Sequence, residues 1–242
     1  MQQRKFSPQR AAKTGSIFLS TAAAYDRWSA GYDGYDNPMV QGATRIVELL
    51  GHKMAGASVF EFGCGTGRNL RALKRLGAAS VAGCDLSEGM LAEARRADAS
   101  LRLFRHDMTR PLPADNATPG AFDRVLFCLT LEHLADMTPP LREAARLLRP
   151  TGRIDIIEIH PDVAAGGVAA HFVDNGETVR MPVFAHGLGE YEAAFKAVGL
   201  CVTLRRQWRP VDFGEAATPK MFKRGGEFPL LVQYQAMLER KE

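Results

Sequence analysis

The amino-acid sequence predicts an α/β fold with a seven-stranded, mostly parallel sheet and helices on both of its faces. Two observations support this fold class. Short apolar runs alternate with segments of helical periodicity, which is typical of parallel strands buried on both sides. The first run also leads into a glycine-rich turn that opens a helix. At 242 residues the chain can bury one sizeable core. We therefore predict a flexible basic tail over residues 1–24 and one domain over residues 25–242.

Each predicted element follows from its own local pattern. The seven apolar runs are 57–62, 81–84, 101–104, 124–129, 154–159, 201–204 and 230–234. Helical spacing covers 68–76, 88–96, 141–148 and 190–198, and Asn37–Pro38 begins an earlier helix. Ser87 is a plausible N-cap and Gly77 a C-cap. Between the fifth strand and the last helix, residues 160–188 show no clean period, so we interpret them as an inserted lid or substrate-binding segment.

The charge distribution does not favour a polyanionic partner. The net charge is +4, but Arg4, Lys5, Arg10 and Lys13 lie in the predicted tail. Without these four, 27 of the 31 basic residues remain, which equals the 27 acidic residues. A solvated tail is the simpler interpretation, and we do not expect a nucleic-acid partner. A second basic cluster keeps the alternative of a nucleic-acid partner open, and its members are Arg205, Arg206, Arg209, Lys220, Lys223 and Arg224.

Composition also bears on the location of the protein. No apolar stretch approaches the length of roughly 18 residues that a membrane span needs, and the N-terminus lacks an apolar signal region. Cys64, Cys84, Cys128 and Cys201 form no C-x-x-C pair and lie in or beside apolar runs. They are typical of small buried thiols in a reducing compartment. We therefore predict a cytoplasmic protein without a membrane partner. No feature of the sequence indicates its oligomeric state.

The glycine-rich turn is the most informative motif. The first strand continues into Glu61-Phe-Gly63-Cys-Gly65-Thr-Gly67-Arg68. Glycines at a strand-to-helix turn let the backbone approach a ligand that any Cβ atom would block. The third glycine comes four positions after the first, one fewer than in the dinucleotide fingerprint G-x-G-x-x-G, and no Lys-Ser or Lys-Thr follows as in a phosphate-binding loop. The fold is thus Rossmann-like, but the ligand is not predicted to be a dinucleotide.

A single acid at the end of the second strand strengthens a ligand-binding interpretation. Asp85 follows Gly67 by 18 residues and closes that strand. A carboxylate there can accept both hydroxyls of a ribose. The alternative is that Asp85 only caps the next helix, a role that Ser87 can fill.

Together these motifs resemble those of the class I S-adenosylmethionine (SAM)-dependent methyltransferases. Glu61 with the three glycines is similar to the family pattern E/D-x-G-x-G-x-G, and the resemblance covers about residues 25–160. The segment 127–134, Phe-Cys-Leu-Thr-Leu-Glu-His-Leu, looks like the fourth-strand motif of the ubiquinone-pathway and related small-molecule enzymes. The segment 147–154 is similar to their L-x-P-G-G turn, with Thr151 in place of the first glycine. The resemblance implies SAM as cofactor and S-adenosylhomocysteine (SAH) as product. It implies these cofactor-binding residues: Tyr32, Glu61, Gly63, Gly65, Gly67, Asp85, Leu86, Asp107, Met108 and Cys128.

Three histidines near the fifth strand are candidates for acceptor chemistry. Ligands of open α/β sheets bind beyond the carboxyl ends of the strands. His160 comes directly after the fifth strand, and His186 and His171 lie in the insertion. A buried or solvated structural role is the alternative for each. We predict His186 and His160 as catalytic bases, and we interpret His133 as structural. No acidic pair has the spacing of a divalent-metal site, so no metal is expected.

The sequence therefore predicts a SAM-dependent methyltransferase that modifies an oxygen or nitrogen of a small molecule, such as a secondary metabolite. We expect the lid to close over the acceptor together with the segment Tyr25–Tyr32. Two alternatives remain: an RNA or protein methyltransferase that uses the basic clusters, and a non-catalytic SAM-binding regulatory protein.

Overall fold

The computed structural model describes residues 16–166 and 170–239. Arg4, Lys5, Arg10 and Lys13 of the predicted tail lie outside the described residues. Residues 16–24 of that predicted tail form a strand and the start of a helix. The folded part of the chain therefore begins before the predicted boundary at residue 25.

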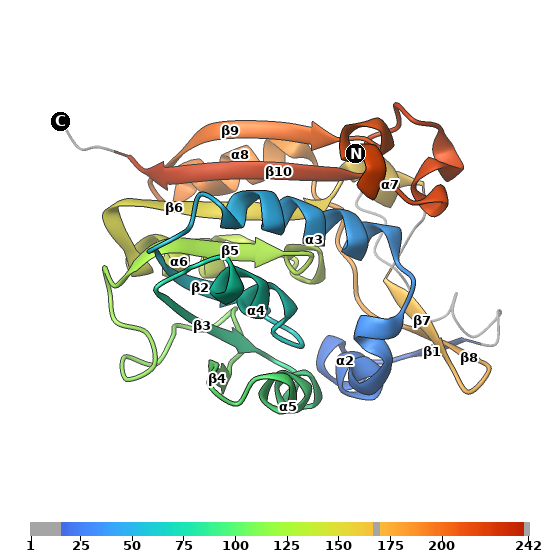
Figure 1. The fold of residues 1–242 in the computed structure, drawn as a ribbon, viewed down its shortest axis with the longest axis horizontal. Helices are drawn as coiled ribbons and strands as arrows, with labels where there is room; N and C mark the ends of the chain where they lie inside the picture. Colours follow the sequence, from blue (N-terminus) through green and yellow to red (C-terminus); the bar gives the residue numbers. More distant parts are fainter. Residues whose placement is uncertain (1–15, 167–169, 240–242) are drawn as a thin grey trace.

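The main sheet has seven strands in the order β4-β3-β2-β5-β6-β10-β9 (Figure 1). In that order they are Arg102–Arg105, Ser80–Asp85, Ser58–Phe62, Phe122–Cys128, Leu148–Ile159, Leu231–Leu238 and Leu200–Trp208. β10 runs antiparallel to both of its neighbours, whereas the strands from β4 to β6 pair in parallel. The predicted fold class is confirmed.

Helices cover the two faces of this sheet (Figure 1). On one face lie α3 (Pro38–Gly51), α4 (Arg68–Arg75) and α5 (Glu88–Ala97), and on the other α6 (Thr138–Leu147) and α8 (Leu188–Ala197). Two predicted caps are present, because the Asn37 side chain accepts from Met39 N and the Ser87 hydroxyl accepts from Met90 N. Each face has a buried apolar core, with Ile46, Leu70 and Leu91 in one and Leu141 and Phe195 in the other.

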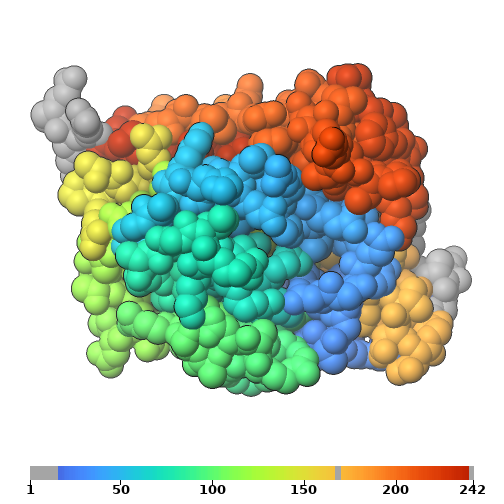
Figure 2. Space-filling view, viewed as in Figure 1, coloured from blue at the N-terminus to red at the C-terminus, as the bar shows by residue number. Residues whose placement is uncertain are grey.

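The insertion after β6 pairs with the N-terminal segment. It contains α7 (Pro161–Ala165) and the hairpin of β7 (His171–Asp174) and β8 (Glu177–Arg180). β1 (Ser16–Phe18) adds to β8 in parallel, which gives a second, three-stranded sheet. Two helical segments follow β1, namely α2 (Thr21–Trp28) and the 3-10 helix η2 (Ser29–Gly34). Figure 2 shows this N-terminal region lying between α5 and the hairpin.

A small apolar core explains why residues 16–24 are ordered. Ala24 and Trp28 of α2 are buried together with Phe172, Val179 and Met181 of the insertion. The rings of Trp28 and Phe172 stack with centroids 4.7 Å apart. The residues that this segment packs against lie about 150 residues further along the chain. Local composition contains no sign of them, and so it predicted a flexible tail.

We expect Phe172→Ala to release the hairpin from α2. Phe172 is 2% exposed, and losing a buried phenyl ring costs about 3–5 kcal/mol. Hydrogen exchange at residues 171–180 should accelerate, with a smaller effect on the strands of the main sheet. Val173→Ala in the same strand is the control, because Val173 is 58% exposed. Equal exchange rates in the two variants would show that Phe172 does not hold the hairpin.

Further short segments complete the fold. A 3-10 turn, η3 (Leu131–His133), follows β5, and η4 (Pro210–Ala216) and η5 (Pro219–Arg224) connect β9 to β10. Among the described helices, none is long and apolar enough to cross a membrane. Cys64, Cys84 and Cys128 are buried as expected, but Cys201 is exposed, because β9 is an edge strand of the sheet.

Candidate functional site

A cavity of about 280 Å³ opens at the carboxyl ends of β2, β3 and β5, under the N-terminal helix α2. Its walls come from segments that are distant in sequence, and each of them follows a strand or belongs to α2 and η2. The residues that line it are Thr21, Ala22, Tyr25, Tyr32, Gly63, Gly65, Asp85, Leu86, Ser87, Met90, Asp107, Met108, Thr109, Cys128, Leu129, Thr130, His133 and Leu134.

The glycine loop gives this cavity its floor. Gly63, Gly65 and Gly67 all adopt positive φ, a conformation that favours glycine. A Cβ atom at Gly65 would meet no atom within 4 Å, so it would project into open space, whereas one at Gly63 would lie 2.2 Å from Thr130 Oγ1. Gly67 does not line the cavity, and a Cβ there would meet Leu101 at 2.9 Å. Gly67 therefore serves the packing of α4, while Gly65 leaves room for a ligand.

Asp85 is fixed at the end of β3 by two backbone amides. Its Oδ2 accepts from Gly65 N at 2.7 Å and its Oδ1 accepts from Ser87 N at 2.9 Å. Burial raises the pKa of Asp85, and the amides of Ser87 and Gly65 oppose that shift. Each carboxylate oxygen keeps a lone pair beside the cavity, which suits a ligand with two neighbouring hydroxyl groups.

Glu61 lies beneath the glycine loop and does not line the cavity. Its Oε1 accepts from Asn69 Nδ2 at 2.7 Å, and burial raises the pKa of the carboxyl to about 8. Glu61 Oε2, Arg68 Nε and Asn69 Oδ1 are buried without a hydrogen-bond partner among the described residues. Buried polar atoms are nearly always satisfied, so this group is suited to a polar ligand or to ordered water.

His133 forms the second polar feature of the cavity wall. Its Nδ1 lies 2.8 Å from the carbonyl oxygen of Pro182, and its Nε2 lies 2.9 Å from the Tyr25 hydroxyl. A carbonyl oxygen only accepts, so Nδ1 carries the proton and Nε2 accepts from Tyr25. Burial lowers the pKa of His133, which favours the neutral ring. The cavity therefore contains an unprotonated nitrogen that already accepts from a phenol.

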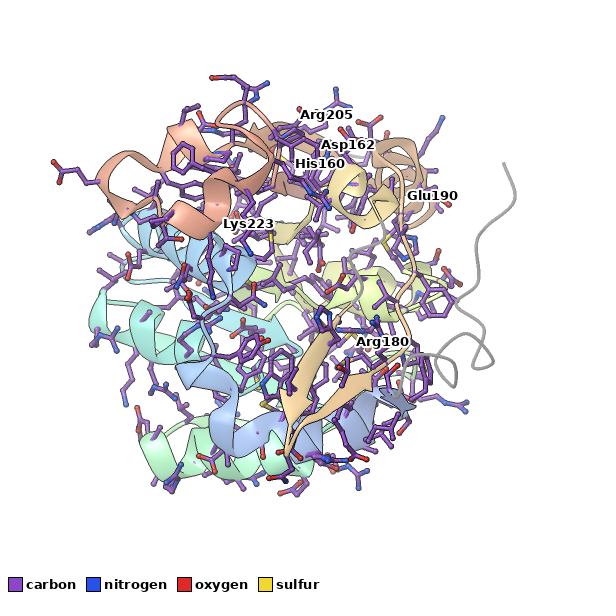
Figure 3. The ribbon with its side chains drawn as sticks, turned by 90° about the vertical axis from the view of Figure 1, so that its right-hand side faces the viewer. His160, Asp162, Arg180, Glu190, Arg205 and Lys223 are labelled. Carbon is purple, nitrogen blue, oxygen red and sulfur yellow. The ribbon has the colours of Figure 1, made fainter. Side chains whose placement is uncertain are left out.

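The structure does not bring the predicted catalytic histidines to the cavity. His160 is 3% exposed and caps α7, since its Nδ1 accepts from Asp162 N (Figure 3). His186 contacts the Leu134 carbonyl through Nε2 and packs edge-on against Tyr191. His171 lies in β7. None of the three lines the cavity, whereas His133, which we interpreted as structural, does.

Comparisons with known proteins agree with this arrangement. A family model described as a methyltransferase domain matches residues 60–156. The demethylmenaquinone methyltransferase of Tropheryma whipplei is 32% identical over 152 residues, which cover 62% of this chain and 61% of that protein. A ubiquinone biosynthesis O-methyltransferase of Xanthomonas oryzae pv. oryzae is 34% identical over 119 residues, 48% of each chain. The chain therefore contains a methyltransferase domain over residues 60–156 and is similar to class I SAM-dependent methyltransferases.

A solved structure shows the same fold. The SAM-dependent methyltransferase from Mesorhizobium loti superposes with a TM-score of 0.65 and 22% identity, over 80% of this chain and 96% of that one. The chain spans about half to three fifths of the length of the curated relatives it matches. The resemblance to the family, on which the predicted cofactor rests, is confirmed.

The cavity fits the family's cofactor, SAM. Most of the predicted cofactor residues line it, namely Tyr32, Gly63, Gly65, Asp85, Leu86, Asp107, Met108 and Cys128, while Glu61 and Gly67 lie behind the loop. The paired lone pairs of Asp85 suit a ribose, and the apolar side chains of Leu86 and Met108 suit a purine ring. Sequence reasoning missed Met90 and Thr130 because nothing in their local pattern sets them apart. Within the described ranges, no three His, Cys, Asp or Glu side chains are arranged to hold a metal ion.

We expect Asp85→Ala to weaken SAM binding by about 1.5–3 kcal/mol, the range for hydrogen bonds to a charged group. Calorimetry with SAM measures the affinity, and circular dichroism checks that the variant is folded. Asp123→Ala is a suitable control, because Asp123 accepts from Ser58 N at 2.8 Å but does not line the cavity. Unchanged affinity in a folded Asp85→Ala variant would refute the role of Asp85.

Proposed function

We propose that the protein transfers the methyl group of SAM to an oxygen or nitrogen atom of a small molecule. One observation carries the proposal. His133 lines the cavity, and its unprotonated Nε2 accepts a hydrogen bond from the hydroxyl of Tyr25, which also lines it. This phenol would relay a proton from an acidic O–H or N–H group of an acceptor to His133. The names of the two curated relatives, one acting in menaquinone and one in ubiquinone biosynthesis, support a small acceptor.

In this proposal SAM supplies an electrophilic methyl group on a sulfonium. The acceptor atom would bond to the methyl carbon as the carbon–sulfur bond breaks. The Tyr25 hydroxyl would take up the proton of the acceptor as it gives its own proton to His133 Nε2. Holding the reacting atoms in line provides much of the rate enhancement, and a base adds about 10²- to 10⁴-fold. The carbonyl of Pro182 orients His133 for this role by fixing its tautomer.

The insertion would exclude water from this reaction. Residues 182–186 are tied to the segment Glu132–Leu134 by three hydrogen bonds. These join Phe184 N to the Glu132 carbonyl, His133 Nδ1 to the Pro182 carbonyl, and His186 Nε2 to the Leu134 carbonyl. The insertion also packs on α2 through Phe172. Both segments of the predicted lid thus lie beside the cavity, as a closed lid requires.

The charges of the cavity bear on the kind of acceptor. Among the residues that the structure describes, Asp85 and Asp107 are the acidic lining residues, and no lysine or arginine lines the cavity. The protein therefore supplies no lysine or arginine that could pair with a carboxylate- or phosphate-bearing acceptor there. We infer that the acceptor is neutral at its reacting end.

The basic cluster of the sequence gives little support to an RNA acceptor. Most of its side chains are already engaged with neighbouring side chains, and Figure 3 shows Arg205 and Lys223 of this region. The ion pairs are Arg205–Glu192, Arg206–Asp212, Arg209–Glu227 and Lys220–Asp36, and Arg224 lies over the Phe228 ring. Such pairing reduces the charge available to phosphates.

A turnover assay tests the proposed function. The protein is incubated with SAM and fractions of a small-molecule extract, and SAH is quantified with and without each fraction. We expect SAH release that depends on a fraction and survives ribonuclease and protease treatment of that fraction. SAH formation that requires RNA or protein would instead support the alternative acceptor, and none with any fraction would support a non-catalytic role.

A further inference from the structure

Two buried carboxyl groups behind the cavity wall have no lysine or arginine paired with them among the residues that the structure describes. Glu158 lies in β6, is fully buried, and accepts from Thr130 N at 2.9 Å and Leu131 N at 2.8 Å through Oε1. Its Oε2 has no hydrogen-bond partner among the described residues. The Glu132 side chain is 13% exposed, and its Oε1 lies 3.9 Å from His133 Nε2. We call Glu132 and Glu158 the carboxyl pair.

The carboxyl pair adjoins the cavity from behind. Thr130 and His133, which contact its two members, both line the cavity. The charge of each member acts on the Tyr25 hydroxyl at the same wall. Burial raises the pKa of Glu132 to about 7, and burial together with the charge of Glu132 raises that of Glu158 to about 8. Both groups therefore titrate near neutral pH.

Two other buried acids of the protein, Asp155 and Glu61, have a basic group nearby. Asp155 pairs with Arg124 at 3.0 Å, and the charge of Arg68 acts on Glu61. Within the described part of the chain, no arginine or lysine forms an ion pair with Glu132 or Glu158. The groups that they act on or bond to include His133, backbone amides and the hydroxyls of Tyr25, Tyr32 and Tyr191. Buried charges are normally paired. A cation bound in the cavity would provide the missing charge.

The cofactor and its product differ in charge at one atom. SAM carries a sulfonium, whereas SAH has a neutral thioether and is otherwise the same molecule. We propose that the carboxyl pair makes the cavity prefer the cationic cofactor to its neutral product. The proposal rests on SAM binding in this cavity, as the family and the proposed function imply. It would explain, from two named residues, why SAM displaces SAH from the cavity after methyl transfer.

The test is a set of binding measurements that needs no acceptor. SAM, SAH and sinefungin, which has an amine cation in place of the sulfonium, are titrated calorimetrically into wild type, Glu132→Gln and Glu158→Gln. Glutamine keeps an oxygen that can accept from Thr130 N and Leu131 N, so the fold should survive, and thermal unfolding checks this. Glu143→Gln is the control, because Glu143 accepts from Leu112 N at 3.0 Å away from the cavity.

We expect either substitution in the carboxyl pair to weaken SAM and sinefungin by about tenfold and SAH by less than about twofold, because only the cations lose a Coulombic partner. Glu143→Gln should change none of the three affinities.

The preference for SAM over SAH should also depend on pH. A bound cation favours the ionised pair, so SAM affinity should fall as the pH drops from about 8 to about 6 and the pair takes up protons. Comparing wild type with the variants cancels the ligands' own titration.

His133 and Asp85 also face this region, and burial lowers the pKa of the imidazole and raises that of the Asp85 carboxyl. The pH dependence is therefore assigned to the carboxyl pair by its loss in Glu132→Gln and Glu158→Gln, which leave His133 and Asp85 in place. Equal weakening of SAM and SAH in the folded variants would overturn the proposal and leave the proposed function intact. Failure of the wild type to bind SAM at all would overturn the proposed function itself. Stabilisation of the wild type by Mg²⁺ alone, lost in Glu132→Gln, would assign the pair to a metal ion and contradict the proposal.

Discussion

A Gly65→Val variant is expected to lose measurable SAM binding while the domain stays folded. Gly65 has a φ of +53°, and a Cβ atom there would point into the open cavity without meeting any protein atom. The two methyl groups of valine would fill space that the ligand needs. A β-branched residue at positive φ also strains the loop by about 1–3 kcal/mol. Calorimetry with SAM should show no heat of binding at concentrations that saturate the wild type.

A second glycine separates occlusion from backbone strain. Gly199, which follows α8, has a φ of +73°, and a Cβ atom added there would likewise meet no atom within 4 Å, but Gly199 does not line the cavity. Gly199→Val should lower the melting temperature by a similar amount and still bind SAM. Normal binding by Gly65→Val would mean that the loop is only a connection. Loss of binding in both variants would mean that strain alone, and not occlusion, abolishes it.

The second large effect is expected on turnover. His133→Ala should lower turnover of a confirmed acceptor by about 10²-fold or more, the range for loss of a general base, and leave SAM affinity within about threefold. The base must be neutral to accept a proton. Burial lowers its pKa from the ordinary value of 6.5, so kcat/KM of the wild type should fall only as the pH drops below that value.

His186→Ala decides between the two candidate bases. His186 bonds a carbonyl of the same loop as His133 but does not line the cavity. We expect this variant to turn over at close to the wild-type rate per folded molecule. The reverse result, with His186→Ala inactive and His133→Ala active, would restore the expectation from sequence. If both variants retain full turnover, positioning alone accounts for catalysis.

Local patterns were enough to predict the main sheet and the cofactor loop. The apolar runs locate its strands, because parallel strands buried on both faces have no polar face to interrupt them. The spacing of Gly63, Gly65 and Gly67 distinguishes the loop from a dinucleotide fingerprint, because glycines are needed at the positions where the backbone adopts positive φ. Asp85 follows from its place at the end of a strand.

The rest of the site depends on long-range packing that no local pattern records. β1 pairs with β8 across about 160 residues, and only that pairing turns the predicted tail into part of the fold. His160 follows a strand end, as a ligand-facing residue should, but its ring is used to cap α7. His133 lies in the family-like motif, and only the positions of Tyr25 and Pro182 reveal that its Nε2 is unprotonated and accepts from Tyr25.

The most direct test of the central claim is a crystal structure of the protein with SAH. We predict density for SAH in the cavity between Gly63, Asp85 and Met108, with both ribose hydroxyls within hydrogen-bond distance of the Asp85 carboxylate. The thioether sulfur should face the wall that contains Tyr25 and His133. SAH bound elsewhere, or a ribose that does not reach Asp85, would contradict the account.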